Sequence, residues 1–101
     1  MKSVFKNVAI ICWQDSVDIH KTLSKLIKHL QRKKINIVLE QDTAKVLANT
    51  QLPAIPSKKL NKHCELIITV GGDGSFLNAA RIAANQDLPV VGINRGRLGF
   101  L

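Results

Sequence analysis

Four short runs of apolar residues, many of them β-branched, recur along the 101-residue chain. They cover residues 8–12, 35–39, 66–70 and 90–93. Nearly continuous apolar runs of this length are typical of strands that are buried on both faces of a parallel sheet. We therefore predict four parallel strands, with polar segments between them.

The segment between the first two runs has the period of an amphipathic helix, predicted over residues 16–34. Asp15 and Ser16 are candidates for its N-cap. The apolar face holds Ile19, Leu23, Leu26, Ile27 and Leu30, and the opposite face holds Lys21, Lys25, Lys28 and Arg32. This basic face is interpreted as solvated, and a contact with nucleic acid or an acidic partner is the alternative.

The remaining segments complete an alternation of strands and helices. Residues 43–49 could form a short helix with Val46 and Leu47 facing inward, and the two prolines of segment 53–56 predict no regular structure there. An alanine-rich helix is expected over residues 76–85. The alternation predicts an α/β fold with a parallel sheet, right-handed crossovers and a ligand site at the carboxyl ends of the strands.

Composition narrows the range of partners. One domain is the most that this length allows, and a net charge of +8 favours an anionic partner: a nucleotide, a nucleic acid or a membrane surface. No apolar run is long enough to span a membrane or to form a signal peptide, so we expect a cytoplasmic protein.

Cysteine and histidine spacing predicts no metal site. Cys12 and Cys64 fall within apolar strands and are expected to be buried, reduced thiols. His20, His29 and His63 lack the spacing of metal ligands and are interpreted as surface residues.

The third strand is followed by the sequence Gly-Gly-Asp-Gly-Ser at residues 71–75. Glycines at a strand-to-helix turn let a phosphate approach the main chain, and the helix start favours an anion. Asp73 would repel a phosphate held directly on the turn, so we expect it to hold a metal ion or to bind a hydroxyl group. The alternative is that Asp73 only caps the helix, although Ser75 could do this as well.

The turn lacks the lysine of a P-loop, and Leu77 occupies the third glycine position of a dinucleotide-binding fingerprint. The motif resembles that of NAD kinases, ATP-dependent phosphofructokinases, and the diacylglycerol and sphingosine kinases. A second segment at residues 92–101, Gly-Ile-Asn-Arg-Gly-Arg-Leu-Gly-Phe-Leu, resembles NAD kinases in particular. The other two groups lack it.

This resemblance implies a Rossmann-like N-terminal domain of the NAD kinase and diacylglycerol kinase superfamily. It implies a kinase that phosphorylates the 2′-hydroxyl of the adenosine ribose of NAD, with ATP or polyphosphate as donor and a divalent cation such as Mg²⁺. Asp73 would accept the proton, Gly72 and Gly74 would contact the nucleotide, and Phe100 would line the NAD pocket. The family often carries a basic residue where this chain has Asn78, so no charge contact is expected there.

NAD kinases continue into a β-rich NAD-binding domain that has no counterpart within residues 1–101. These residues are therefore expected to form the N-terminal domain, inactive alone, of an enzyme that forms homo-oligomers. We expect no membrane or nucleic-acid partner. The alternatives are a lipid or sugar-phosphate kinase with the same glycine motif, and a non-catalytic, basic nucleotide-binding module.

Overall fold

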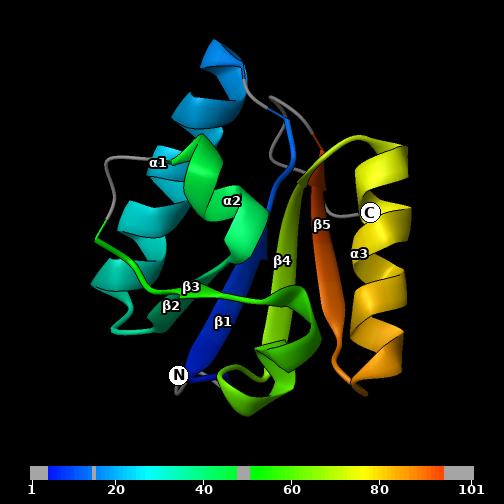
Figure 1. The fold of residues 1–101 in the computed structure, drawn as a ribbon. Coiled ribbons are helices and arrows are strands. Elements are labelled where there is room, and N and C mark those ends of the chain that lie inside the picture. Colours follow the sequence, from blue (N-terminus) through cyan, green and yellow to red (C-terminus); the bar gives the residue numbers. More distant parts are fainter. Residues whose placement is uncertain (1–4, 15, 48–50, 95–101) are drawn as a thin grey trace.

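The computed structural model describes residues 5–14, 16–47 and 51–94. Its centre is a five-stranded sheet with the strand order β3-β2-β1-β4-β5 (Figure 1). The strands are β1 (Asn7–Ile11), β2 (Asn36–Glu40), β3 (Ala54–Ile55), β4 (Leu66–Gly71) and β5 (Val90–Asn94). Each neighbouring pair is parallel, which confirms the α/β class and the parallel sheet predicted from the sequence.

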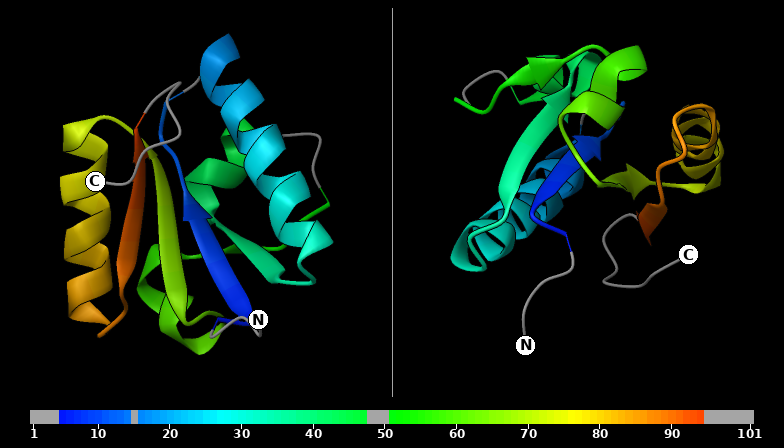
Figure 2. Two further views of the ribbon diagram at one scale, coloured as in Figure 1. Left: turned by 180° about the vertical axis from the view of Figure 1, so that it is seen from behind. Right: turned by 90° about the horizontal axis from the view of Figure 1, so that it is seen from below.

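The helical elements alternate with the strands. They are α1 (Val17–Arg32), α2 (Gln41–Val46), the 3₁₀ helix η1 (Ser57–Lys62) and α3 (Asp73–Asn85). Helices α1 and α3 lie on opposite sides of the sheet, which both views of Figure 2 also show. No helix in the described ranges combines the length and apolarity needed to cross a membrane.

Two apolar clusters fill the layers between sheet and helices. The first joins α1 to one face of the sheet and consists of Val8, Ile10, Cys12, Ile19, Leu23, Leu30, Ile37, Leu39, Ile68, Val70 and Ile93. The second joins α3 and η1 to the other face and consists of Ala9, Ile11, Leu60, Cys64, Ile67, Ala79 and Ala83. Residues of β1 and β4 alternate between the two clusters, because successive side chains of a strand point to opposite faces. The central strands are thus buried on both sides, as their unbroken apolar sequences predicted.

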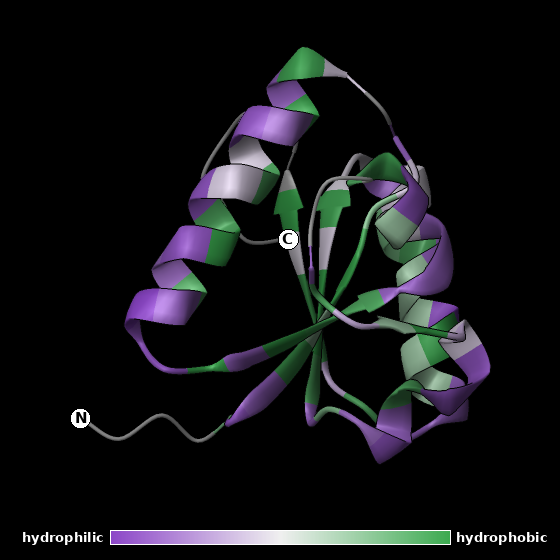
Figure 3. Ribbon diagram, turned by 60° about the vertical axis from the view of Figure 1, so that its left-hand side comes forward, coloured by the Kyte–Doolittle hydropathy of each residue, from purple (hydrophilic) through white to green (hydrophobic). Residues whose placement is uncertain are grey.

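Helix α1 starts after Ser16 and has the polarity that its sequence predicted, but it ends at Arg32, two residues before the predicted end. Ser16 is its N-cap, and the Ser16 hydroxyl accepts a hydrogen bond from the Ile19 N–H at 3.2 Å. The residues of the basic face, Lys21, Lys25, Lys28 and Arg32, are all exposed. Figure 3 shows this polar outer side of α1 and the apolar side that faces the sheet.

The prediction of no regular structure between the two prolines was wrong. Ala54 and Ile55 form β3, which pairs with Leu39 and Glu40 at the edge of the sheet. An edge strand tolerates proline, which has no N–H to donate. The Pro53 carbonyl still takes part in the pairing, because it accepts from the Leu39 N–H at 2.8 Å.

The short helix predicted over residues 43–49 begins two residues earlier, at Gln41. Its start is set by the Glu40 carboxylate, which accepts hydrogen bonds from the main-chain N–H groups of Asp42 and Thr43. Thr43 is the buried residue of this helix, whereas Val46 is only half-buried. Leu47, half-buried just after the helix, packs against the first cluster as predicted.

Candidate functional site

The order in which strands are added to the sheet reverses between β1 and β4. It runs outward from β1 through β2 to β3, then returns to β4 and continues to β5 on the other side. Helices α1 and α3 leave the neighbouring strands β1 and β4 toward opposite faces, so the carboxyl ends of these two strands form a topological switch point. Ligands of doubly wound sheets bind at such a switch point.

The glycine turn lies at this point, and Gly71 gives it its shape. Gly71 is the last residue of β4 and has a φ of 152°, a conformation that side chains rarely adopt. A Cβ at this position would also lie 2.9 Å from the Ser75 Oγ. Glycine at position 71 is therefore required by the fold itself.

Helix α3 begins at Asp73, three residues before the predicted start. Gly72 is its N-cap, with extended backbone angles, and Asp73 occupies the first helical position. A negative charge in the first turn is favoured by the helix dipole, and this explains why the helix extends into the glycine motif.

The two candidates for a side-chain cap do not cap α3. No side-chain hydrogen bond caps this helix, so neither Asp73 nor Ser75 fulfils that role. Asp73 is exposed, and no described residue forms a hydrogen bond or ion pair with its carboxylate. The first main-chain N–H groups of α3 thus lack a side-chain acceptor among the described residues, and an acid that the described fold does not use stands beside them.

Gly72 and Gly74 differ from Gly71 because the described fold does not require glycine at their positions. Neither has a positive φ, and a Cβ added to either would meet no described atom within 4 Å. Within the described part of the chain, neither backbone conformation nor packing requires glycine at these positions. The space beside them is open for a ligand or for another part of the protein.

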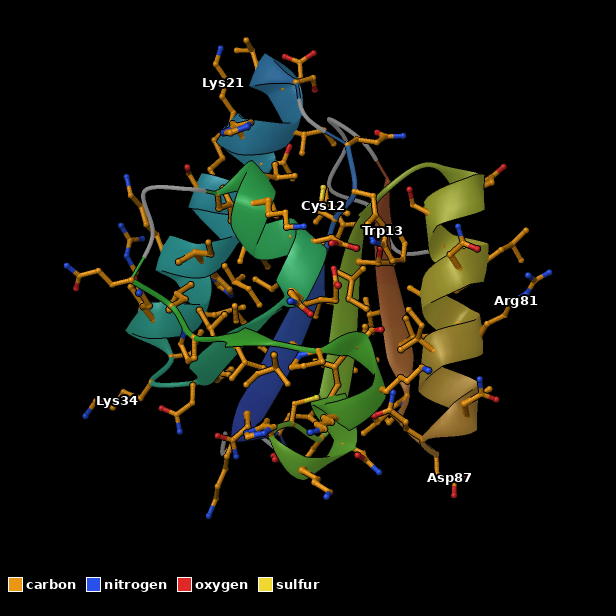
Figure 4. All side chains as sticks on the ribbon, viewed as in Figure 1. Cys12, Trp13, Lys21, Lys34, Arg81 and Asp87 are labelled. Carbon is orange, nitrogen blue, oxygen red and sulfur yellow. The ribbon has the colours of Figure 1, made fainter. Side chains whose placement is uncertain are left out.

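The loop after β1 lies across the switch point from the glycine turn. Cys12 follows the strand and is buried, Trp13 is half-buried against the second cluster, and Gln14 is exposed. The Gln14 side-chain carbon Cδ lies 3.9 Å from the position that a Cβ of Gly71 would take. The two loops therefore approach each other at the switch point, and Figure 4 shows Cys12 and Trp13 at this end of the sheet.

The second predicted segment begins beside the glycine turn. The register of β4 and β5 pairs Gly71 with Asn94, so residues 92–94 lead to the same end of the sheet as the turn. Phe100, the candidate of this segment, lies outside the described residues. Asn78 lies exposed on α3.

Metal-ligating side chains do not gather at this end of the sheet. The described ranges contain no group of three or more His, Cys, Asp or Glu residues that could hold a metal ion. Mg²⁺ that arrives with nucleotide phosphates needs only one or two protein carboxylates, so a metal carried by the substrate still fits the exposed Asp73.

The glycine turn is an open rim. One shallow depression lies along the start of α1, and another lies between η1 and α3. Neither is lined by residues 71–75. A closed ligand pocket at the turn would need further walls beyond those that the described residues supply.

Sequence reasoning located the turn and its acid but missed Gln14 and Thr43, which shape the opposite side. Gln14 could have been found as a polar residue directly after the first strand. Thr43 fell in a segment of ambiguous structure, and its role depends on a contact with β1 that no local pattern shows.

The strand order and the open glycine turn at the switch point define a doubly wound, Rossmann-like α/β domain. Residues 8–101 match the family model of the ATP-NAD kinase N-terminal domain. The chain belongs to this family, which confirms the predicted resemblance.

Curated relatives agree with this assignment. The chain is 46% identical over 99 residues to the NAD kinase of Marinomonas sp. (strain MWYL1), covering 98% of this chain and 34% of that protein. It is 42% identical over 100 residues to the NAD kinase of Coxiella burnetii (strain RSA 493 / Nine Mile phase I), covering 99% of this chain and 33% of that protein. The chain thus spans about a third of the length of these relatives.

The fold also has a counterpart among solved structures. A crystal structure of yeast NADH kinase complexed with NADH superposes with a TM-score of 0.73 at 24% identity, covering 95% of this chain and 33% of that one. At this identity the likeness supports the fold.

Proposed function

We propose that this chain is the N-terminal domain of an NAD kinase, which transfers a phosphoryl group to the 2′-hydroxyl of the adenosine ribose of NAD. The proposal rests on the exposure of Asp73 and on its lack of hydrogen-bond partners among the described residues, in a chain that belongs to this family. Its carboxylate is exposed at the start of α3, receives no hydrogen bond from the described residues, and stands between two glycines with open Cβ positions.

Asp73 orients the ribose hydroxyl in this proposal. A carboxylate is a weak base toward an alcohol. Phosphoryl transfer through a loose transition state needs little prior deprotonation, so the acid can accept the proton late. Its main contribution is then to hold the hydroxyl oxygen in line with the phosphorus atom.

The rest of the turn binds the nucleotide. Gly72 and Gly74 let the nucleotide approach the main chain closely. Phe100 would line the NAD pocket. The phosphoryl donor would be ATP or polyphosphate, and a divalent cation bound with the donor's phosphates would neutralise the charge that develops during transfer.

Other parts of the complete protein are needed for this activity. We propose that it has a β-rich domain with most of the NAD-binding surface, that it forms homo-oligomers and that it works in the cytoplasm. The length ratio to the curated relatives and the open rim at residues 71–75 support a requirement for further protein at this site.

The test is an Asp73→Asn substitution in the complete protein, with NADP formation measured at saturating ATP and NAD. We expect kcat to fall by about 10²–10⁴, the usual contribution of a positioned acid–base group, while the affinity for NAD changes less. The free energy of unfolding should hardly change, because the described residues make no hydrogen bond to Asp73.

Asp18→Asn is the matched control, since Asp18 is an exposed aspartate in the first turn of α1. This variant should keep wild-type kcat. Undiminished turnover by Asp73→Asn would remove Asp73 from the mechanism. Phosphorylation of diacylglycerol or fructose 6-phosphate in place of NAD would refute the proposed substrate.

Salt-sensitive binding of polyanions that is indifferent to Asp73, without any kinase activity, would instead identify a basic binding module.

A further inference from the structure

A buried polar cluster lies where β1 and β2 end, outside the residues already placed at the glycine turn. Thr43 is fully buried and Glu40 is 3% exposed. The Thr43 hydroxyl donates to the Glu40 Oε1 at 3.1 Å and accepts from the Cys12 N–H at 2.7 Å. One hydroxyl therefore connects the start of α2 to the end of β1.

Capping of α2 does not explain this arrangement. The Glu40 carboxylate caps the helix through the N–H groups of Asp42 and Thr43, at 2.9 and 3.1 Å. The Thr43 hydroxyl adds nothing to that cap, because it extends to a residue 31 positions away in the sequence. Its partner Cys12 is the first residue after β1, and its N–H is buried beyond the paired part of that strand.

The contacts continue from Cys12 to the glycine turn. The Cys12 thiol donates to the Gln14 carbonyl at 3.5 Å, and the Gln14 side-chain Cδ lies 3.9 Å from the position that a Cβ of Gly71 would take. Gly71 directly precedes Gly72 and Asp73. A continuous path thus runs from the buried Glu40 and Thr43, through the loop after β1, to the turn that carries the proposed catalytic acid.

We infer that Thr43, held by Glu40, is a positioning residue for the proposed reaction. It fixes the loop at residues 12–14. This loop follows β1 and lies at the switch point, next to the glycine turn that it helps to hold in place. Because Thr43 is fully buried, it acts through Cys12 and Gln14 and does not touch the substrate. This inference rests on the proposed function for its effect on catalysis, but its effect on the turn can be measured independently.

The experiment compares Thr43→Val and Thr43→Ser in the complete protein, well below the temperature of unfolding. Valine keeps the shape but removes the hydroxyl, which leaves the Cys12 N–H without this acceptor, whereas serine keeps the hydroxyl. We expect Thr43→Val to lower kcat/KM for NAD about ten- to hundredfold, as small displacements of a site do. Thr43→Ser should stay within about twofold of wild type, since its hydroxyl can make the same two bonds.

Amide ¹H–¹⁵N signals provide the readout that a merely structural role would not move. Thr43→Val should shift the signals of Cys12 and Gln14 and, beyond them, those of Gly71 and Gly72, while Thr43→Ser leaves the latter two in place. The control is Ile37→Val, a buried change in β2 that pairs with Val8 near the other end of the sheet.

The inference is overturned if Thr43→Val leaves the signals of Gly71 and Gly72 unchanged. It is also overturned if Ile37→Val lowers kcat/KM as much as Thr43→Val at the same folded fraction. A wild-type protein that makes no NADP would refute the proposed function, while the amide signals would still decide whether Thr43 holds the turn.

Discussion

Two strand-to-helix turns at the same end of the sheet each carry an acid, and the fold uses the two acids differently. Glu40, between β2 and α2, is buried, and its two carboxylate oxygens accept hydrogen bonds from Asp42, the Thr43 N–H and the Thr43 hydroxyl. Asp73, at the start of α3, is exposed and receives none from the described residues. Glu40 is a structural acid, and Asp73 is free for other chemistry.

The same contrast separates the glycines of the second turn. Gly71 is required by its φ of 152° and by the Ser75 Oγ, which a Cβ at this position would meet at 2.9 Å. Gly72 and Gly74 have no such requirement among the described residues. Residues that a fold does not need for itself are the best candidates for ligand binding, and here they surround the acid that the fold does not use.

The largest effect among the remaining predictions is expected from Gly74→Ala. The added methyl group should stabilise the fold by about 0.4–1 kcal/mol, because glycine loses more backbone entropy on folding and the position is open. The same methyl group should prevent close approach of the nucleotide and lower kcat/KM for NAD about tenfold or more. Thermal unfolding and steady-state kinetics of the complete protein measure the two changes.

Gly71→Ala is the control for this prediction. Its backbone conformation is unsuitable for alanine, so it should lose about 1–3 kcal/mol of stability. If Gly74→Ala kept full activity, the open space beside Gly74 would not be the path of the nucleotide.

A smaller effect, on stability alone, is expected when the charges of the two acids are removed. Glu40→Gln should lower the free energy of unfolding by about 1–2 kcal/mol, because one of the two accepting oxygens becomes an NH2 group that cannot accept and the hydrogen bonds that remain are weaker. Asp73→Asn should change it by less than about 0.5 kcal/mol. Urea unfolding of both variants tests the contrast, and equal losses would show that the fold uses both acids.

The smallest effect concerns Glu65, just before β4 at the opposite end of the sheet from the glycine turn. Its carboxylate accepts hydrogen bonds from the Asn7 side chain at 2.9 Å and from the Lys6 N–H at 2.9 Å. These bonds lower the pKa of Glu65 below its ordinary value of 4.5. Its contribution to stability is therefore present above pH 4.5 and is lost as the pH falls through the lowered pKa.

The thermal midpoints of wild type and Glu65→Gln should accordingly differ slightly at pH 6 and converge in more acidic solution. A difference that grows toward acid pH would mean that the pKa is raised instead.

Much of the fold followed from the sequence, because local patterns determine it. The buried strands have apolar sequences that no solvent-facing strand would carry, and the apolar positions of α1 repeat with the helical period. Ser16 caps α1 as predicted, and Cys12 and Cys64 are buried cysteines. One feature that was missed depends on a distant partner. The edge strand β3 exists because β2 offers Leu39 and Glu40 for pairing. The start of α2 was missed for another reason: its N-cap Glu40 is local, but glutamate is not among the usual N-cap residues.

The candidate site was predictable in part for the same reason. Glycines and an acid after a buried strand form a local pattern, so the turn and Asp73 were found. The path from Glu40 through Thr43 to Gln14 joins three segments that come together only in the folded chain. The role of Phe100 stays a prediction, since this residue lies outside the described part of the chain.

The most direct measurement is the distance between the Asp73 carboxylate and the ribose 2′-oxygen in a crystal of the complete protein with NAD bound. We predict that one carboxylate oxygen lies about 2.6–3.2 Å from this hydroxyl, within reach for hydrogen bonding and proton transfer. A carboxylate that points away from the ribose, with the 2′-oxygen held by other groups, would contradict the proposed role of Asp73.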